Sequence, residues 1–161
     1  MMRARRRLIG VAVIVVAAVL LAGCAFAPPA TRTPDPALAS LATELAAVDG
    51  VQDAVATFSY DGSPTIKRLN VRIYLREPAN GDLSAITTET LRKAWNFTGF
   101  EPSAYSFQVW NGPKQLPPYD YSKRVDLTTV FPQLDLPDSR VYKSDLYVSS
   151  ADLKAKFGPR K

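Results

Sequence analysis

Apolar and polar residues alternate most regularly between residues 69 and 76, close to the middle of the chain. The apolar positions are Leu69, Val71, Ile73 and Leu75, and the intervening positions are Asn70, Arg72, Tyr74 and Arg76. Because successive side chains of a β-strand point to opposite faces of a sheet, this pattern predicts a strand that is buried on one face only.

Three further segments show the composition of strands. They are residues 51–60, residues 104–110 and residues 141–148. Within the second of these, Tyr105, Phe107 and Val109 alternate with Ser106, Gln108 and Trp110. This alternation predicts another strand with one apolar face and one partly polar face.

Three segments carry the signals of amphipathic helices. The first begins at Asp35, a capping residue followed by Pro36, and repeats apolar residues at spacings of three and four up to Val48. The second follows Asp82 and ends near residue 99, and the third covers residues 151–157 with Ser150 as its expected N-cap. Between the second and third helices, residues 111–137 are irregular and rich in proline, with one helical turn expected around residues 125–131.

The order of these elements favours an α+β fold. A strand–turn–strand unit points to antiparallel pairing, and helices between such units favour a layer of helices on one face of a sheet. We therefore expect a small antiparallel sheet of about four strands with helices packed on one face. The element order resembles a ferredoxin-like arrangement, and this resemblance is one of order alone. Residues 35–161 have a usual size for one domain.

The first 24 residues predict where the protein is located. Four arginines precede an apolar run of 14 residues, Leu8 to Leu21, which is shorter than the roughly 20 that a membrane-spanning helix needs. This is the pattern of a secretory signal peptide. The run ends in Leu21-Ala22-Gly23-Cys24, which resembles the lipobox of bacterial lipoproteins. The resemblance implies cleavage before Cys24, lipidation of the Cys24 thiol, and a partner role for the membrane that holds this lipid.

These signals divide the chain into three parts. Residues 1–23 are the expected signal peptide, residues 24–34 the lipidated cysteine with a proline-rich tether, and residues 35–161 the folded domain. A proline-rich tether of ten residues extends on the order of 30 Å. We thus expect an exported protein, anchored by lipid on the extracytoplasmic side of the cell membrane.

Charge and composition exclude several function classes. Four of the 20 basic residues and none of the 15 acidic ones precede Cys24, so the remainder of the chain is nearly neutral. A nearly neutral exported domain gives no reason to expect nucleic-acid binding. Cys24 is the only cysteine and the chain has no histidine, which excludes a disulfide, histidine-based triads and thiolate or histidine metal sites. We expect no cofactor and no metal.

The polar side of the predicted sheet is the candidate binding surface. Its proposed residues are Asn70, Arg72, Tyr74, Arg76, Gln108 and Trp110, joined by Tyr119 and Tyr121 from the irregular segment. Arginines bind carboxylates and phosphates, and aromatic rings stack on flat apolar surfaces such as those of sugars. The alternative is an ordinary solvated face of an antiparallel sheet, with the two tyrosines holding their loop to the domain.

Carboxylates supply the other candidate chemistry. Acids recur at Asp120, Asp126, Asp135, Asp138, Asp145 and Asp152. A pair of them would suit a glycoside hydrolase, although most occupy positions typical of turns and helix caps. The sequence therefore favours a non-catalytic binding or assembly module for an envelope protein or an anionic or sugar-like envelope polymer. The alternative is a small carboxylate-based hydrolase acting on envelope carbohydrate.

Overall fold

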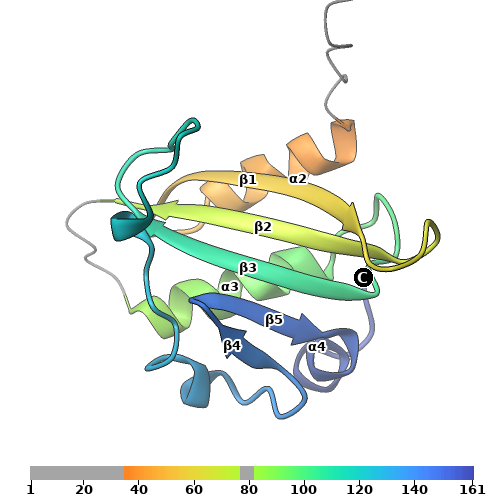
Figure 1. The fold of residues 1–161 in the computed structure, drawn as a ribbon. Helices are drawn as coiled ribbons and strands as arrows, with labels where there is room; N and C mark the ends of the chain where they lie inside the picture. The colour runs from red at the N-terminus through yellow and green to blue at the C-terminus, as the bar shows by residue number, and fades with distance from the viewer. Residues whose placement is uncertain (1–34, 77–81) are drawn as a thin grey trace, which may run out of the picture. The chain divides into compact units, whose positions relative to one another are not determined.

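The computed structural model describes residues 35–76 and 82–161, which form an open five-stranded sheet with helices against it (Figure 1). The strands are β1 (Val51–Tyr60), β2 (Lys67–Leu75), β3 (Ala104–Asn111), β4 (Arg140–Tyr142) and β5 (Asp145–Ser149). Their order across the sheet is β1-β2-β3-β5-β4. The predicted α+β class is confirmed.

The sheet differs from the predicted one in strand direction at its centre. Strands β2 and β3 pair in parallel, whereas all other neighbours pair antiparallel. The cause is the helix α3 (Leu83–Trp95), which connects these two strands. A crossover of this kind carries the chain back to the end at which β2 began, so β3 runs in the same direction. The sheet is therefore mixed.

The sheet also has five strands where about four were expected. The segment 141–148, predicted as one strand, is the hairpin of β4 and β5. Its turn residues Lys143 and Ser144 have φ angles of 49° and 65°. Two consecutive positive φ angles close a tight hairpin, and this turn is usually marked by Gly or Asn. Neither residue type occurs here, so the sequence does not mark the turn between the two strands.

Three helices cover one face of the sheet (Figure 1). Helix α2 (Pro36–Ala46) and helix α3 begin at the predicted caps Asp35 and Asp82, whose carboxylates accept hydrogen bonds from backbone N–H groups two residues later. Helix α4 (Ser150–Phe157) is capped by Ser149 and not by Ser150. The Ser149 hydroxyl accepts from the backbone N–H of Asp152 at 3.0 Å.

The hydrophobic core lies between the sheet and these helices. It contains the predicted apolar side of β2, the residues Tyr105, Phe107 and Val109 of β3, and the apolar faces of α2 and α3. The predicted apolar faces of β2, β3, α2 and α3 are therefore confirmed as core faces. No helix among the described residues has both the length and the apolar character required to cross a bilayer.

The irregular segment contains two short 3-10 helices. They are η1 (Tyr121–Lys123) and η2 (Phe131–Leu134). The helical turn expected around residues 125–131 is therefore displaced toward the C-terminus. Leu127, Val130, Leu134 and Leu136 belong to the buried core, so these residues attach the segment between β3 and β4 to it.

Candidate binding face

The strand register places the predicted polar residues together on the face that the helices leave uncovered. Arg72 of β2 is level with Gln108 of β3, and Asn70 is level with Ser106. On the other side of β2, Thr57 of β1 is the register partner of Asn70. Residues directly opposite in neighbouring strands point to the same side of a sheet. The parallel pairing of β2 and β3 therefore builds one continuous polar surface from segments far apart in the sequence.

Part of this face is covered by residues 112–124, which we call the covering segment. Strand β5 pairs only with the first half of β3, from Ala104 to Phe107. Beside the second half of β3, the covering segment returns to the sheet, where Arg124 forms a bridge with Trp110 and Val125 donates a backbone hydrogen bond to Val109 at 2.9 Å. The covering segment thus lies along the part of the β3 edge that does not pair with β5.

The covering segment buries two residues that were expected to be exposed. Tyr74 and Trp110 are each only 1% exposed. The rings of Tyr119 and Tyr121 lie 5.9 and 5.6 Å from the ring of Trp110. The prediction that Tyr74 and Trp110 lie on an open surface is therefore wrong, because two tyrosines of the irregular segment pack over this end of the sheet.

Arg72 is the charged centre of the remaining open surface. Its Nε donates a hydrogen bond to Oε1 of Gln108 at 2.9 Å. The guanidinium carbon lies 4.6 Å from the centroid of the Tyr119 ring and 5.4 Å from that of Trp110, so it makes cation–π contacts with both. Among the described residues, no carboxylate forms an ion pair with Arg72. The guanidinium group is instead contacted by the neutral side chains of Gln108, Trp110 and Tyr119.

Arg72 remains charged at this site. Burial lowers the pKa of Arg72, but hydrogen bonding to the side chains of Tyr74 and Tyr119 more than offsets this, and the pKa lies above its ordinary value. Arg72 is therefore a permanent cation at any pH of biological interest.

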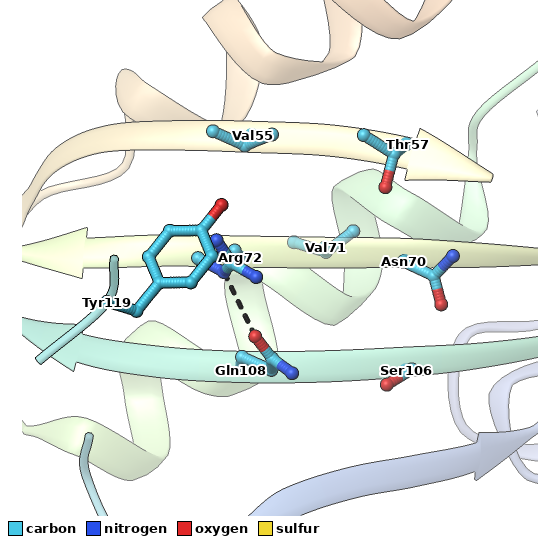
Figure 2. Close-up of a pocket in the computed structure, with 8 residues that line it drawn as sticks. All are labelled: Val55, Thr57, Asn70, Val71, Arg72, Ser106, Gln108 and Tyr119. Carbon is cyan, nitrogen blue, oxygen red and sulfur yellow. Dashed lines mark hydrogen bonds between the residues drawn. The ribbon is translucent and has the colours of Figure 1, made fainter. Parts of the chain in front are cut away.

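A hollow of about 380 Å³ opens beside this cation. It is lined by Val55, Thr57, Asn70, Val71, Arg72, Ser106, Gln108 and Tyr119. Figure 2 shows the Tyr119 ring lying over Arg72, and Asn70, Thr57 and Ser106 further along the three strands. Arg72 is the one charged residue of this lining. We call this site the Arg72 hollow.

The structure thus brings together four of the eight residues proposed from sequence. Asn70, Arg72, Gln108 and Tyr119 line the Arg72 hollow. Tyr74 and Trp110 support the site from beneath the covering segment, and Tyr121 packs on Trp110 with 66% of its surface exposed. Arg76 is exposed at the end of β2 and does not line the hollow.

Sequence reasoning did not single out Thr57 and Val55 of β1. Both residues point to the open face, as the register with β2 requires. The segment 51–60 contains few large apolar residues, so its two faces are hard to distinguish in the sequence. A weak signal exists in the polar residues Asp53, Thr57 and Ser59, which share one face of the strand.

The acidic residues serve the fold locally. Asp120 and Asp126 accept hydrogen bonds from Ser122 and Thr128, and these bonds lower the pKa of each carboxyl below its ordinary value. Asp145 forms an ion pair with Arg124. No acid lines the Arg72 hollow. In the described part of the chain, no three Asp, Glu, Cys or His residues cluster as metal ligands would.

Asp152 is a buried carboxylate with a structural role. It accepts backbone hydrogen bonds from Asp138 at 3.0 and 3.2 Å, and it accepts another from the Ser139 hydroxyl. It therefore ties the start of β4 to the first turn of α4. A second, smaller hollow of about 170 Å³ lies nearby and includes Arg68, Arg140 and Tyr147 in its lining.

Searches against protein-family models, curated proteins and solved structures find no match for this chain. The predicted signal peptide, the lipidation at Cys24 and the tether lie outside the described residues.

Proposed function

We propose that this protein is a lipid-anchored component of the bacterial cell envelope that acts as a non-catalytic binding module. Its membrane anchor is the lipid on Cys24, as the resemblance to the lipobox implies. Its binding surface is the Arg72 hollow with the adjacent covering segment. The partner is an envelope polymer or an envelope protein that presents an anionic group.

The observation that carries this proposal is the unpaired charge of Arg72. A partly buried cation is normally compensated by a carboxylate, because burial removes favourable hydration. Arg72 instead contacts the neutral side chains of Gln108, Trp110 and Tyr119. It has five N–H donors, and its protein partners leave some of them available. An anionic group entering the hollow would supply the missing negative charge.

Two other arginines near this face are compensated by carboxylates. Arg68 forms an ion pair with Asp61 at 2.5 Å, and Arg124 forms one with Asp145. Arg72 differs from these two arginines because neutral side chains surround its guanidinium group.

The alternative of a carboxylate-based hydrolase gains less support from the geometry. Glycoside hydrolysis uses two carboxyl groups roughly 5 to 9.5 Å apart on either side of the substrate. The larger hollow has no carboxylate in its lining. Asp120, Asp126 and Asp152 are engaged in hydrogen bonds that stabilise turns and a helix start. The arrangement is suited to holding a ligand and offers no acid–base pair to cleave it.

A capture experiment with the full-length lipoprotein tests this function. Tagged wild-type protein is expressed in its native bacterium and solubilised from the membrane. The proteins and glycans that remain bound to it are then identified by mass spectrometry. The test variant is Arg72→Gln. The matched control is Arg92→Gln, which removes an exposed arginine from α3 on the helical side of the sheet.

The expected result is a partner that wild type and Arg92→Gln retain and that Arg72→Gln loses by at least tenfold. If all three proteins capture the same partner equally, the Arg72 hollow is not the binding surface. If a carbohydrate is released in fragments during incubation with wild type, the hydrolase replaces the binding module.

A further inference from the structure

The chemistry of the Arg72 hollow narrows the class of ligand. This step rests on the proposed binding function of the same site. We propose that the hollow binds a hydroxyl-rich unit carrying a single negative charge, such as a uronate or a polyol phosphodiester within an envelope polymer.

The charge of the ligand follows from the charges in the hollow. Arg72 is the one ionised side chain of the lining. Arg68, on the same face of β2, is four residues away, which corresponds to roughly 13 Å along a strand, and Asp61 compensates it. A carboxylate or a phosphodiester carries one negative charge and matches one arginine. A phosphomonoester carries close to two at neutral pH and would leave excess negative charge in the site.

The hydroxyl groups of the ligand follow from the other polar residues. Thr57, Asn70, Ser106 and Gln108 present hydroxyl and amide groups, which can both donate and accept hydrogen bonds. Asn70 donates to the Ser59 hydroxyl at 3.1 Å, and the amide oxygen of Gln108 accepts from Arg72. These bonds orient the two amides and leave the Asn70 oxygen and the Gln108 NH₂ group for a ligand. Neutral groups of this kind complement alcohols and do not attract further charge.

The shape of the hollow suits a compact ring or a short polyol chain. The Tyr119 ring lies above Arg72 at one end, and Val55 contributes an apolar side chain from β1 (Figure 2). Sugars have apolar C–H surfaces that pack on aromatic and aliphatic groups, and hydroxyl edges that form hydrogen bonds. The anionic end of such a unit would lie at Arg72, and its hydroxyls would lie toward Ser106 and Asn70.

Small probes test this inference by isothermal titration calorimetry on the detergent-solubilised full-length lipoprotein. Methyl β-D-glucuronide and glycerophosphoglycerol each combine hydroxyls with one charge, as a carboxylate and as a phosphodiester respectively. Methyl β-D-glucoside lacks the charge, acetate lacks the hydroxyls, and glucose 6-phosphate has a phosphomonoester. The two single-charge probes also distinguish the two sources of the anion.

We expect at least one of the two single-charge probes to bind at least tenfold more tightly than the glucoside, acetate and glucose 6-phosphate. Arg72→Gln should weaken that probe by at least tenfold, and Arg92→Gln should leave it unchanged. A second variant, Asn70→Asp, keeps the size of the side chain and places a carboxylate beside Arg72. It should also abolish binding, so the inference is testable even if Arg72→Gln folds poorly.

Two outcomes overturn the inference. Equal binding of methyl glucoside and methyl glucuronide, or tighter binding of glucose 6-phosphate, would show that a single charge is not what the site selects. If neither single-charge probe binds while Arg72 remains necessary for partner capture, the proposed ligand class is refuted and the proposed binding function is retained.

Discussion

The guanidinium carbon of Arg72 lies 4.6 Å from the centre of the Tyr119 ring, although β2 and the covering segment are far apart in the sequence (Figure 2). This contact joins the one unpaired cation of the hollow to the irregular part of the chain. Because Tyr119 also packs against Trp110, the covering segment holds the wall of the hollow in place. Binding and the conformation of this segment are thereby linked.

Replacement of Tyr119 tests this link. Tyr119→Ala removes a wall of the hollow and one cation–π contact, so we expect the affinity for the bound single-charge probe to fall about three- to tenfold. The free energy of unfolding should fall by about 1 kcal/mol. Tyr121→Ala is the matched control, since Tyr121 also packs on Trp110 but does not line the hollow. Equal loss of affinity in the two variants would contradict a direct role for Tyr119.

A second prediction concerns the buried carboxylate of Asp152. It accepts hydrogen bonds from Asp138 and Ser139. An amide at this position would direct N–H groups toward these donors, so Asp152→Asn should lower the free energy of unfolding by about 1–3 kcal/mol. Urea denaturation measures the change. Asp138→Asn, which alters an exposed carboxylate next to the same bonds, should stay within about 0.5 kcal/mol of wild type.

The two faces of the central strands were predictable because they depend only on local periodicity. Leu69 and Ile73 face the core, whereas Asn70 and Arg72 face the other side, as the alternation requires. Arg72 was therefore identified as a candidate from sequence. The importance of Arg72 could not be predicted, because its lack of a carboxylate partner depends on where the acidic residues lie in the folded structure.

The solvent exposure of the residues on the open face of the sheet could not be predicted from periodicity. Trp110 was placed on the correct side of β3, but periodicity carries no information about what covers a side. The bridge between Trp110 and Arg124 is a tertiary contact with an irregular segment. Likewise, the turn at Lys143 and Ser144 lacks the residue types that mark positive φ angles, so the last two strands were merged.

A third prediction concerns the membrane anchor. If Cys24 is lipidated, mass spectrometry of the mature protein should find an N-terminal peptide that begins at Cys24 and carries acyl chains. In Cys24→Ser neither the cleavage nor the acylation should occur. Membrane association alone does not distinguish the two proteins, because an uncleaved apolar segment also retains a chain at the membrane. A wild-type N-terminus elsewhere, or an unmodified Cys24, would contradict the lipoprotein assignment.

The last prediction follows from the burial of Tyr105 beneath the C-terminal residues. Its hydroxyl accepts a hydrogen bond from Arg160 at 2.9 Å. Burial raises the pKa of Tyr105 to about 12, and the charge of Arg160 opposes this rise only in part. The ordinary tyrosine pKa is about 10. Between these two values the unfolded chain loses the phenolic proton and the folded chain keeps it.

The sign of the pH effect follows directly. The folded state binds more protons than the unfolded state above pH 10, so the free energy of unfolding should decrease as the pH rises from about 10 to 12. The stabilisation is fully present below pH 10, and the loss attributable to Tyr105 is on the order of 2 kcal/mol. Tyr105→Phe should remove this component, whereas Tyr142→Phe, at an exposed position of β4, should retain it. Parallel decreases in wild type and Tyr105→Phe between pH 10 and 12 would contradict the prediction, because the destabilisation would then arise from other groups.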